Sequence, residues 1–195
     1  MESTLSVGII VASVREGRRG EAFGKWIHEL IGERPNITSE LLDLNEWPLP
    51  AYSSRDNPMA AEKGYAPGTL ERRWADRISA LDGFVIVTPE YSHGYPGALK
   101  NALDHLYVAW NYKPVGFISY GGFAAGARAV EQLRQVAIEL RMVPIRDEVN
   151  LRLIGLSVDD RSFPSDELYS KRAVAMIDEL LWWTQIMKEA RGRRR

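Results

Sequence analysis

The sequence predicts an α/β fold in which a parallel sheet of five strands is covered by helices on both faces. Short apolar runs alternate with segments of helical periodicity five times in succession, which is the pattern of parallel strands joined by right-handed helical crossovers. The first, third and fourth runs contain no charge and no polar alternation. Strands of that kind are typically buried on both faces, as in a three-layer sandwich.

The predicted strands are short and well separated. They cover residues 7–12, 40–44, 84–87, 115–118 and 143–149, and charged residues interrupt only the second and the last. Between the third and fourth strands, an apolar stripe with i, i+3, i+4 spacing runs from Leu99 to Trp110. Pro96 is expected at the first helical position there, where its missing N–H costs nothing.

Further helices are expected at residues 20–33 and 69–81, along the apolar stripe 129–140, and at residues 165–190. Residues 47–67 contain four prolines and no clear period, so we expect a long surface loop that contributes to function. The basic tail 191–195 is expected to be a solvated helix end. The whole chain, residues 1–195, is expected to form one domain.

Composition excludes several classes of function. The 195 residues are 45% hydrophobic and 26% charged with a net charge of −1, which gives no general attraction to nucleic acid or to an anionic membrane. Cysteine is absent, which excludes disulfides, thiolate metal sites and cysteine nucleophiles. The N-terminus lacks the features of a signal peptide and no apolar run is long enough to span a bilayer. We therefore expect a cytoplasmic protein.

The segments that follow the first, third and fourth strands are the most unusual in the chain. If the strand order is 2-1-3-4-5, these three strands are adjacent and their carboxyl ends meet where the order reverses, which is where ligands bind in open α/β sheets. The first segment offers Ser13, Arg15, Arg18 and Gly20 ahead of a helix. A hydroxyl, guanidinium groups and glycine backbone at a helix N-terminus are typical of a phosphate site.

The other two segments are suited to a flat ring. After the third strand, residues 88–97 contain two prolines, two glycines and two tyrosines, which give a shaped turn and apolar surface. After the fourth strand, the tandem glycines Gly121 and Gly122 allow backbone N–H groups to approach a ligand closely. Together the three segments predict a site for a ligand with a phosphate and a ring system.

Several alternative sites are absent from the sequence. It contains no P-loop, no G-x-G-x-x-G fingerprint and no G-x-S-x-G nucleophile elbow. His28 and His105 lie in predicted helices as surface or packing residues, His93 lies in the third-strand segment, and the three have no metal-ligand spacing. A site with so few nucleophiles and bases suits a cofactor that supplies the chemistry, so no catalytic side chain and no metal are expected.

At these segments the sequence resembles the NADPH-dependent FMN reductase family, a flavodoxin-like group that includes bacterial quinone, chromate and azo-compound reductases. The resemblance depends on residues 12–15, on the long motif at residues 88–104, and on residues 119–122 with Arg128 in the helix beyond. It covers roughly residues 5–155. It implies the flavodoxin-like strand order 2-1-3-4-5, FMN as the cofactor, and NADPH or NADH as the hydride donor.

The resemblance also implies a role for each part of the site. Ser13 and Arg15, with Arg18 or Gly20, would hold the FMN phosphate. The isoalloxazine would be lined by Pro89, Glu90, Tyr91 and Ser92, and its pyrimidine side would meet Ser119, Tyr120, Gly121 and Gly122. The sequence departs from the family pattern at Ala12, where glycine is frequent, and at Ser92, where asparagine is frequent.

These implications describe an FMN-dependent NAD(P)H oxidoreductase whose acceptor is a quinone, an azo compound, a flavin or a similar small molecule. Three alternatives stay open at this point: a flavodoxin-type electron carrier, a phosphate- or nucleotide-binding protein without flavin, and a flavin-free scaffold. The near-neutral charge disfavours a carrier, since such carriers are usually strongly acidic. A homodimer or homotetramer is expected, with Trp110, Trp182 and Trp183 as candidate interface residues.

Overall fold

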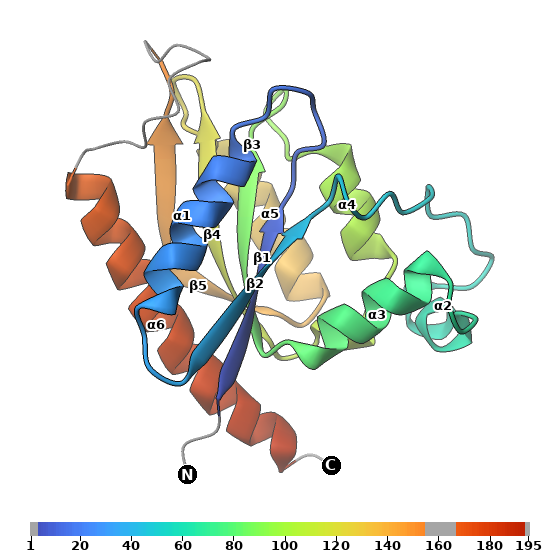
Figure 1. Cartoon of the computed structure of the whole chain (residues 1–195). Helices are drawn as coiled ribbons and strands as arrows, with labels where there is room; N and C mark the ends of the chain where they lie inside the picture. The colour runs from blue at the N-terminus through green and yellow to red at the C-terminus, as the bar shows by residue number, and fades with distance from the viewer. Residues whose placement is uncertain (1–3, 155–166, 194–195) are drawn as a thin grey trace.

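A computed structural model describes residues 4–154 and 167–193 and confirms the predicted sheet (Figure 1). Five parallel strands lie in the order β2-β1-β3-β4-β5. The strands are β1 (Leu5–Val11), β2 (Ile37–Asp43), β3 (Gly83–Pro89), β4 (Pro114–Gly121) and β5 (Val143–Arg152). Every residue of β3 is buried, as expected for a central strand covered on both faces.

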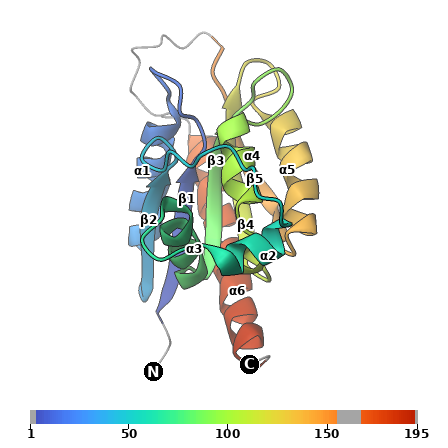
Figure 2. The same cartoon turned by 90° about the vertical axis from the view of Figure 1, so that its right-hand side faces the viewer.

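The helices form a layer on each side of this sheet (Figure 2). They are α1 (Gly20–Gly32), α2 (Pro58–Gly64), α3 (Leu70–Ala80), α4 (Gly97–Asp104), the 3-10 helix η1 (Val108–Trp110), α5 (Ala127–Glu139) and α6 (Glu167–Gly192). Apolar side chains of α1 and α6 pack on one face of the sheet, and those of α3, α4 and α5 pack on the other. We refer to these as the α1 face and the α5 face.

The segment 47–67 was predicted to be a loop, but it contains the short helix α2. The carboxylate of Glu62 in α2 accepts hydrogen bonds from the backbone N–H groups of Tyr107, Val108 and Ala109. These N–H groups open η1 and would otherwise be unpaired. The contact fixes α2 against the body of the protein.

The predicted helix between β3 and β4 is also shorter than expected. Pro96 is the residue before α4 rather than its first residue, and the α-helix ends at Asp104. The apolar stripe continues through Leu106 and Trp110, which are fully buried, but its last part lies on η1. Trp110 is therefore a core residue, and the prediction that it contributes to an interface is wrong.

His105 and Asn101 hold the start of the segment 47–67 in place. Asn101 Nδ2 donates to the carbonyl oxygens of Leu49 and Pro50, and His105 Nε2 lies 2.9 Å from that of Pro50. His105 is 3% exposed, so it packs inside the protein rather than at the surface.

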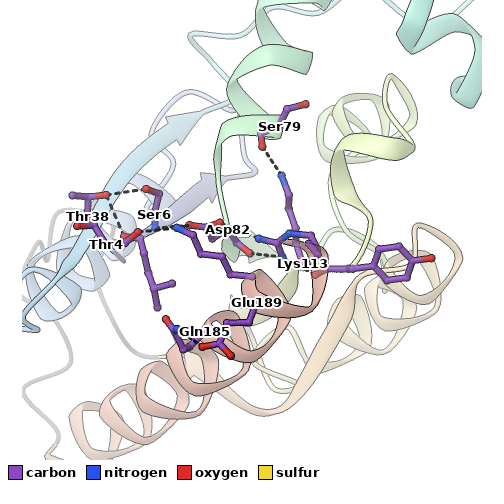
Figure 3. Close-up of polar contacts among 12 residues, drawn as sticks. Thr4, Ser6, Thr38, Ser79, Asp82, Lys113, Gln185 and Glu189 are labelled. Carbon is purple, nitrogen blue, oxygen red and sulfur yellow. Dashed lines mark hydrogen bonds and ion pairs between the residues drawn. The ribbon is translucent and has the colours of Figure 1, made fainter. Parts of the chain in front are cut away.

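The end of α6 is anchored at the amino end of the sheet (Figure 3). Asp82 lies just before β3 and forms ion pairs with Lys188 at 2.7 Å and with Arg191 at 2.9 Å. Arg191 also donates to the carbonyl of Tyr112. Arg191 thus belongs to α6 and is bound, so the expectation of a solvated tail from residue 191 is wrong there. Residues 194–195 of that tail, and Ser165 at the predicted helix start, lie outside the described residues.

Neither a membrane-spanning helix nor a metal-binding cluster is found among the described residues. Within residues 4–154 and 167–193, no helix is both long and apolar enough to cross a membrane. The same residues contain no group of three or more histidine, aspartate and glutamate side chains arranged to hold a metal ion.

Candidate functional site

A cavity of about 310 Å³ lies at the carboxyl ends of the strands. Its walls come from the segments that follow β1, β3, β4 and β5. The lining residues are Arg15, Gly17, Arg18, Arg19, Pro89, Glu90, Tyr91, Tyr120, Gly121, Gly122, Leu153 and Ile154. The position agrees with the rule that open α/β sheets bind ligands where the strand order reverses, here between β1 and β3.

The segment between β1 and α1 begins with a buried serine. Ser13 is 1% exposed, and its hydroxyl lies 2.7 Å from the hydroxyl of Tyr91, which follows β3. The same oxygen accepts a hydrogen bond from the backbone N–H of Arg15. Ser13 thus ties the first segment to the third-strand segment and orients Arg15. In the described part of the chain, Arg15 forms no ion pair, so its charge is available at the cavity.

Arg18 has a different role from Arg15 because a carboxylate already neutralises it. Its guanidinium lies 2.5 Å from Oδ2 of Asp43, the last residue of β2. This hydrogen bond raises the pKa of Arg18 above its ordinary value. The Nε atom is buried and has no hydrogen-bond partner among the described residues. Arg18 therefore keeps one free donor at the cavity.

Tyr120 and Gly20 are in close contact where β4 meets the start of α1. A Cβ on Gly20 would lie 2.8 Å from the Tyr120 hydroxyl, so only glycine fits there without displacement. The hydroxyl is buried beside Ser13 and Gly20, yet no described residue meets it with hydrogen-bond geometry. Burial, together with nearby Tyr91, raises the pKa of Tyr120, which keeps the hydroxyl protonated as a neutral donor.

The segment after β3 forms a tight turn. Tyr91 and Gly94 exchange two backbone hydrogen bonds of 2.8 and 2.9 Å across Ser92 and His93. Both central residues have positive φ angles, 50° and 72°. Such angles in residues other than glycine cost on the order of 1–3 kcal/mol each and persist only where neighbours hold them.

Arg128 of α5 supplies part of that support. Its guanidinium pairs with Oε1 of Glu90, with Nε at 2.6 Å, and its Nη1 lies 2.8 Å from Nε2 of His93. Because arginine only donates, Nε2 accepts, which assigns the imidazole proton to Nδ1. Gln132, one turn further along α5, donates to the backbone carbonyl of His93. Three contacts from one helix therefore fix the turn beside the cavity.

Glu90 also presents an unpaired atom to the cavity. Its side chain is only 7% exposed, and the second carboxylate oxygen, Oε2, is buried without a hydrogen-bond partner in the described structure. A buried, unpaired carboxylate oxygen is costly. It marks a place where a ligand N–H or O–H can bind.

The segment after β4 is shaped by Ser119 and Gly126. Ser119 is completely buried, and its hydroxyl donates to the carbonyl of Ala125 and accepts from Asn150. Gly126 has a φ of 86°, and a Cβ there would lie 2.6 Å from that of Ser119. By contrast, a Cβ on Gly122 would meet nothing within 4 Å. Gly122 therefore leaves open space at the cavity wall.

The structure brings most of the predicted site residues together. Those that line the cavity are Arg15, Arg18, Pro89, Glu90, Tyr91, Tyr120, Gly121 and Gly122. Four others do not line it: Ser13, Gly20 and Ser119 support the wall through the contacts above, and Ser92 is an exposed residue of the turn after β3. That Tyr120 lies beside the ring stays a prediction. Its hydroxyl lies with the β1–α1 segment, near Ser13 and Gly20.

Four residues that line the cavity were not predicted from the sequence. Gly17 and Arg19 lie within the segment already identified, whereas Leu153 and Ile154 follow β5. Leu153 and Ile154 could have been predicted, because β5 is the neighbour of β4 and its carboxyl end lies at the same edge of the sheet. The pairing of Asp43 with Arg18 was also missed.

The fold and the cavity define the class of the protein: it is a flavodoxin-like α/β protein with a cavity at the switch point of the sheet. Comparison with known proteins is more specific. The profile of the family described as NADPH-dependent FMN reductase matches residues 5–154. The chain belongs to this family.

Individual relatives agree with this assignment. An NAD(P)H-dependent FMN reductase of Schizosaccharomyces pombe is 39% identical over 155 residues, which cover 77% of this chain and 76% of that protein. A quinone reductase of Escherichia coli K12 is 34% identical over 149 residues, covering 72% and 73%. The solved structure of FerB, a flavoenzyme NAD(P)H:(acceptor) oxidoreductase from Paracoccus denitrificans, superposes with a TM-score of 0.74 at 24% identity, covering 94% and 98%, which shows the same fold.

Membership of this family makes the chain an oxidoreductase that depends on FMN and NAD(P)H. The cavity fits that cofactor. Among the described residues, Arg18 Nε and the Tyr120 hydroxyl have no hydrogen-bond partner and Arg15 has no ion-pair partner, so all three are donors of the kind a phosphate requires, near the N-terminus of α1. Gly121 and Gly122 offer backbone at the opposite wall, where a ring can approach closely.

Proposed function

We propose that the cavity between β1, β3, β4 and β5 holds FMN and passes electrons from NAD(P)H to a small organic acceptor, of which a quinone is the first candidate. The observation that supports this most is the division of one cavity into two ends. Arg15 and two further donors that are unpaired within the described residues lie at one end, and glycine backbone lies at the other.

In this proposal Arg15 supplies the charge that binds the cofactor phosphate, and Tyr120 and Arg18 Nε supply neutral and charged hydrogen bonds to it. Bound FMN supplies two-electron transfer between a hydride donor and an acceptor. The backbone N–H groups of Gly121 and Gly122 act as fixed donors beside the ring. Such preorganised donors favour the negative charge that the reduced state develops.

No side chain is proposed as a general base. His93 accepts from Arg128, and Glu90 pairs with the same guanidinium, so both hold the turn that lines the ring. Arg128 is in this sense a positioning residue. The remaining Glu90 Oε2 is proposed to accept a hydrogen bond from the cofactor.

A quinone is favoured as acceptor because the curated relatives include quinone reductases. The carrier alternative is disfavoured by the family assignment and by the net charge of −1. A colourless protein that cannot be loaded with FMN would favour the phosphate-binding or scaffold alternatives instead.

The proposal is tested by anaerobic titration of FMN-loaded protein with NADPH or NADH, followed by addition of a quinone. We expect loss of the flavin absorbance on reduction and its return when quinone is added, with steady turnover when both substrates are present. Protein that binds FMN but is not reduced by either nucleotide contradicts the proposed function.

We also propose that the chain forms a homodimer or homotetramer. Trp182 on α6 is 59% exposed and Ile186, one turn away, is 39% exposed, whereas Trp183 packs partly against the core. Contiguous exposed apolar side chains of this size are typical of protein interfaces. A monomer mass that is independent of concentration in light scattering contradicts this proposal.

We propose further that residues 1–195 act as one domain in the cytoplasm. The support is the single sheet formed by β1 to β5 and a composition without cysteine. Limited proteolysis that releases two stable fragments contradicts the first statement, and recovery of the protein outside the cytoplasmic fraction contradicts the second.

A further inference from the structure

Phe123 is an aromatic ring that the fold leaves almost entirely in solvent. Its exposed fraction is 86%, the highest among the large hydrophobic side chains described. It directly follows Gly121 and Gly122, which line the cavity, so Phe123 lies next to the cavity wall without lining it. Packing among residues 4–154 and 167–193 does not account for its presence there.

A guanidinium group covers one side of this ring. The Cζ atom of Arg152 lies over Phe123, 5.4 Å from the ring centroid, within the range of a cation–π contact. Among residues 4–154 and 167–193, no carboxylate forms an ion pair with Arg152, which is exposed at the end of β5. Within the described part of the chain, the pair thus offers an aromatic surface and a positive charge with no ion-pair partner at one place.

Phe123, which follows β4, and Arg152, which ends β5, are both connected to the cavity wall. The backbone N–H of Leu153 donates to the carbonyl of Gly121 at 2.9 Å, and both residues line the cavity. Phe123 and Arg152 are therefore held beside each other at the rim by the same contact that closes the wall.

This rim lies on the opposite face of the sheet from the phosphate end. Leu151 is buried on the α1 face, in the cluster formed with α1 and α6. Arg152, the next residue along β5, therefore points to the α5 face. The α1 helix, with Arg15 and Arg18 ahead of it, lies on the first side. The site therefore has a second basic position that the cofactor phosphate does not explain.

We propose that Phe123 and Arg152 form the binding subsite for the adenosine half of NADPH, with the adenine stacked on Phe123 and the 2′-phosphate bound by Arg152. Aromatic rings stack with bases of any identity, and guanidinium groups pair with phosphate through two parallel hydrogen bonds. This subsite rests on the proposed function and makes Arg152 the residue that distinguishes NADPH from NADH.

The test compares Arg152→Met and Phe123→Ala with the wild type in the FMN-loaded protein. The KM values for NADPH and NADH are measured with a fixed quinone, and the Kd values of NADP⁺ and NAD⁺ are measured by calorimetry. Arg152→Met is expected to raise the NADPH KM and the NADP⁺ Kd roughly tenfold or more, while the NADH and NAD⁺ values change by less than about twofold. Phe123→Ala is expected to weaken both nucleotides by roughly fivefold or more.

Matched controls are available elsewhere on the surface. Arg146, also on β5, has a side chain that is 93% exposed, and Ile138 on α5 is 66% exposed; neither lines the cavity. Arg146→Met and Ile138→Ala are expected to leave all four values unchanged. Arg152→Lys, which keeps the charge, is expected to restore part of the preference for NADPH.

Three results overturn the subsite. They are an unchanged NADPH KM in Arg152→Met, an equal rise for NADPH and NADH in that variant, and an unchanged Kd for both nucleotides in Phe123→Ala. Failure of the proposed function itself is read separately from the wild type, which would then bind FMN without being reduced by either nucleotide.

Discussion

Three buried polar atoms at the cavity wall, Tyr120 Oη, Arg18 Nε and Glu90 Oε2, have no hydrogen-bond partner within the described part of the chain. Leaving such an atom unpaired costs about 1–3 kcal/mol, more if it is charged. Two are donors at the end where α1 begins, and the third is an acceptor beside the turn after β3. Their positions match a ligand that is anionic at one end and carries N–H or O–H groups further along.

The role of the Tyr120 hydroxyl can be tested with a single substitution. Tyr120→Phe removes an unpaired hydroxyl and keeps the ring, which packs on Phe23 with centroids 5.0 Å apart. We therefore expect the free energy of unfolding of the cofactor-free protein to stay the same or rise by up to about 1 kcal/mol. The affinity for FMN is expected to fall roughly tenfold, because the phosphate loses a donor.

Chemical denaturation of the cofactor-free protein and a fluorescence titration with FMN measure the two effects. Tyr112→Phe removes a hydroxyl far from the cavity, at the amino end of β4, and serves as the control for FMN affinity. A Tyr120→Phe variant that binds FMN as tightly as the wild type contradicts the assignment of this hydroxyl.

The residue types of the site could be predicted from the sequence, but their pairing could not. Serine, arginine and glycine ahead of a helix indicate a phosphate site, and Arg15 lies at the cavity as expected. Arg18 looks equivalent to Arg15 in the sequence. Only the fold places Asp43 at the end of the adjacent β2 strand, 25 residues away, and so neutralises Arg18.

At the scale of elements, α6 is fixed by charges at the amino end of the sheet. Asp82 binds Lys188 and Arg191 of α6 and accepts from the backbone of Ser6, which joins α6 to β1 and β3. Nearby, Lys113 is 5% exposed, and its ammonium donates to the carbonyls of Ile78 and Ser79 at the end of α3 (Figure 3).

Lys113 makes the stability depend on pH. Burial, with the nearby charge of Arg191, lowers the pKa of Lys113 to about 7, although Asp82 and Glu62 oppose the shift. In the unfolded chain a lysine titrates near its ordinary value of about 10.4. Between these two values the unfolded chain binds more protons than the folded protein, so the free energy of unfolding rises with pH.

We expect Lys113→Met to remove this rise. Relative to the variant, the wild type should gain stability between pH 7 and pH 9, on the order of 2 kcal/mol, as followed by urea denaturation across that range. Lys171, with a side chain 72% exposed, provides the control, since Lys171→Met should retain the wild-type slope. Parallel pH profiles for the wild type and Lys113→Met would show that Lys113 keeps its charge when folded.

The elements that the sequence predicts best are those buried on both faces. The short, apolar and uncharged runs of β1, β3 and β4 are recognisable in the sequence, because this composition is typical of central strands that are buried on both faces. Helix α2 has seven residues, begins at Pro58 and buries only Ala61 and Glu62, so it has no apolar period to detect. It is held by the contact of Glu62 with η1, a tertiary interaction between segments 45 residues apart.

At the scale of the whole molecule, the sheet separates two ends of one site. The β1–α1 segment brings Arg15, Arg18 and the start of α1 to one face, and the β5 end brings Arg152 to the other. The turns after β3 and β4 lie between them. The strand order 2-1-3-4-5 places these four segments around a single cavity. The order was expected from the flavodoxin-like resemblance, and it puts the three unusual segments at adjacent strand ends.

We propose that this cavity binds FMN through its phosphate. FMN differs from riboflavin only by that phosphate, so the most direct measurement compares the Kd values of the two for the wild type, Arg15→Ala and the control Arg146→Ala. We predict that the wild type and the control prefer FMN by roughly tenfold or more, and that Arg15→Ala loses most of that preference while binding riboflavin as before. Equal affinity of the wild type for FMN and riboflavin, or a preference that Arg15→Ala leaves intact, would contradict the account.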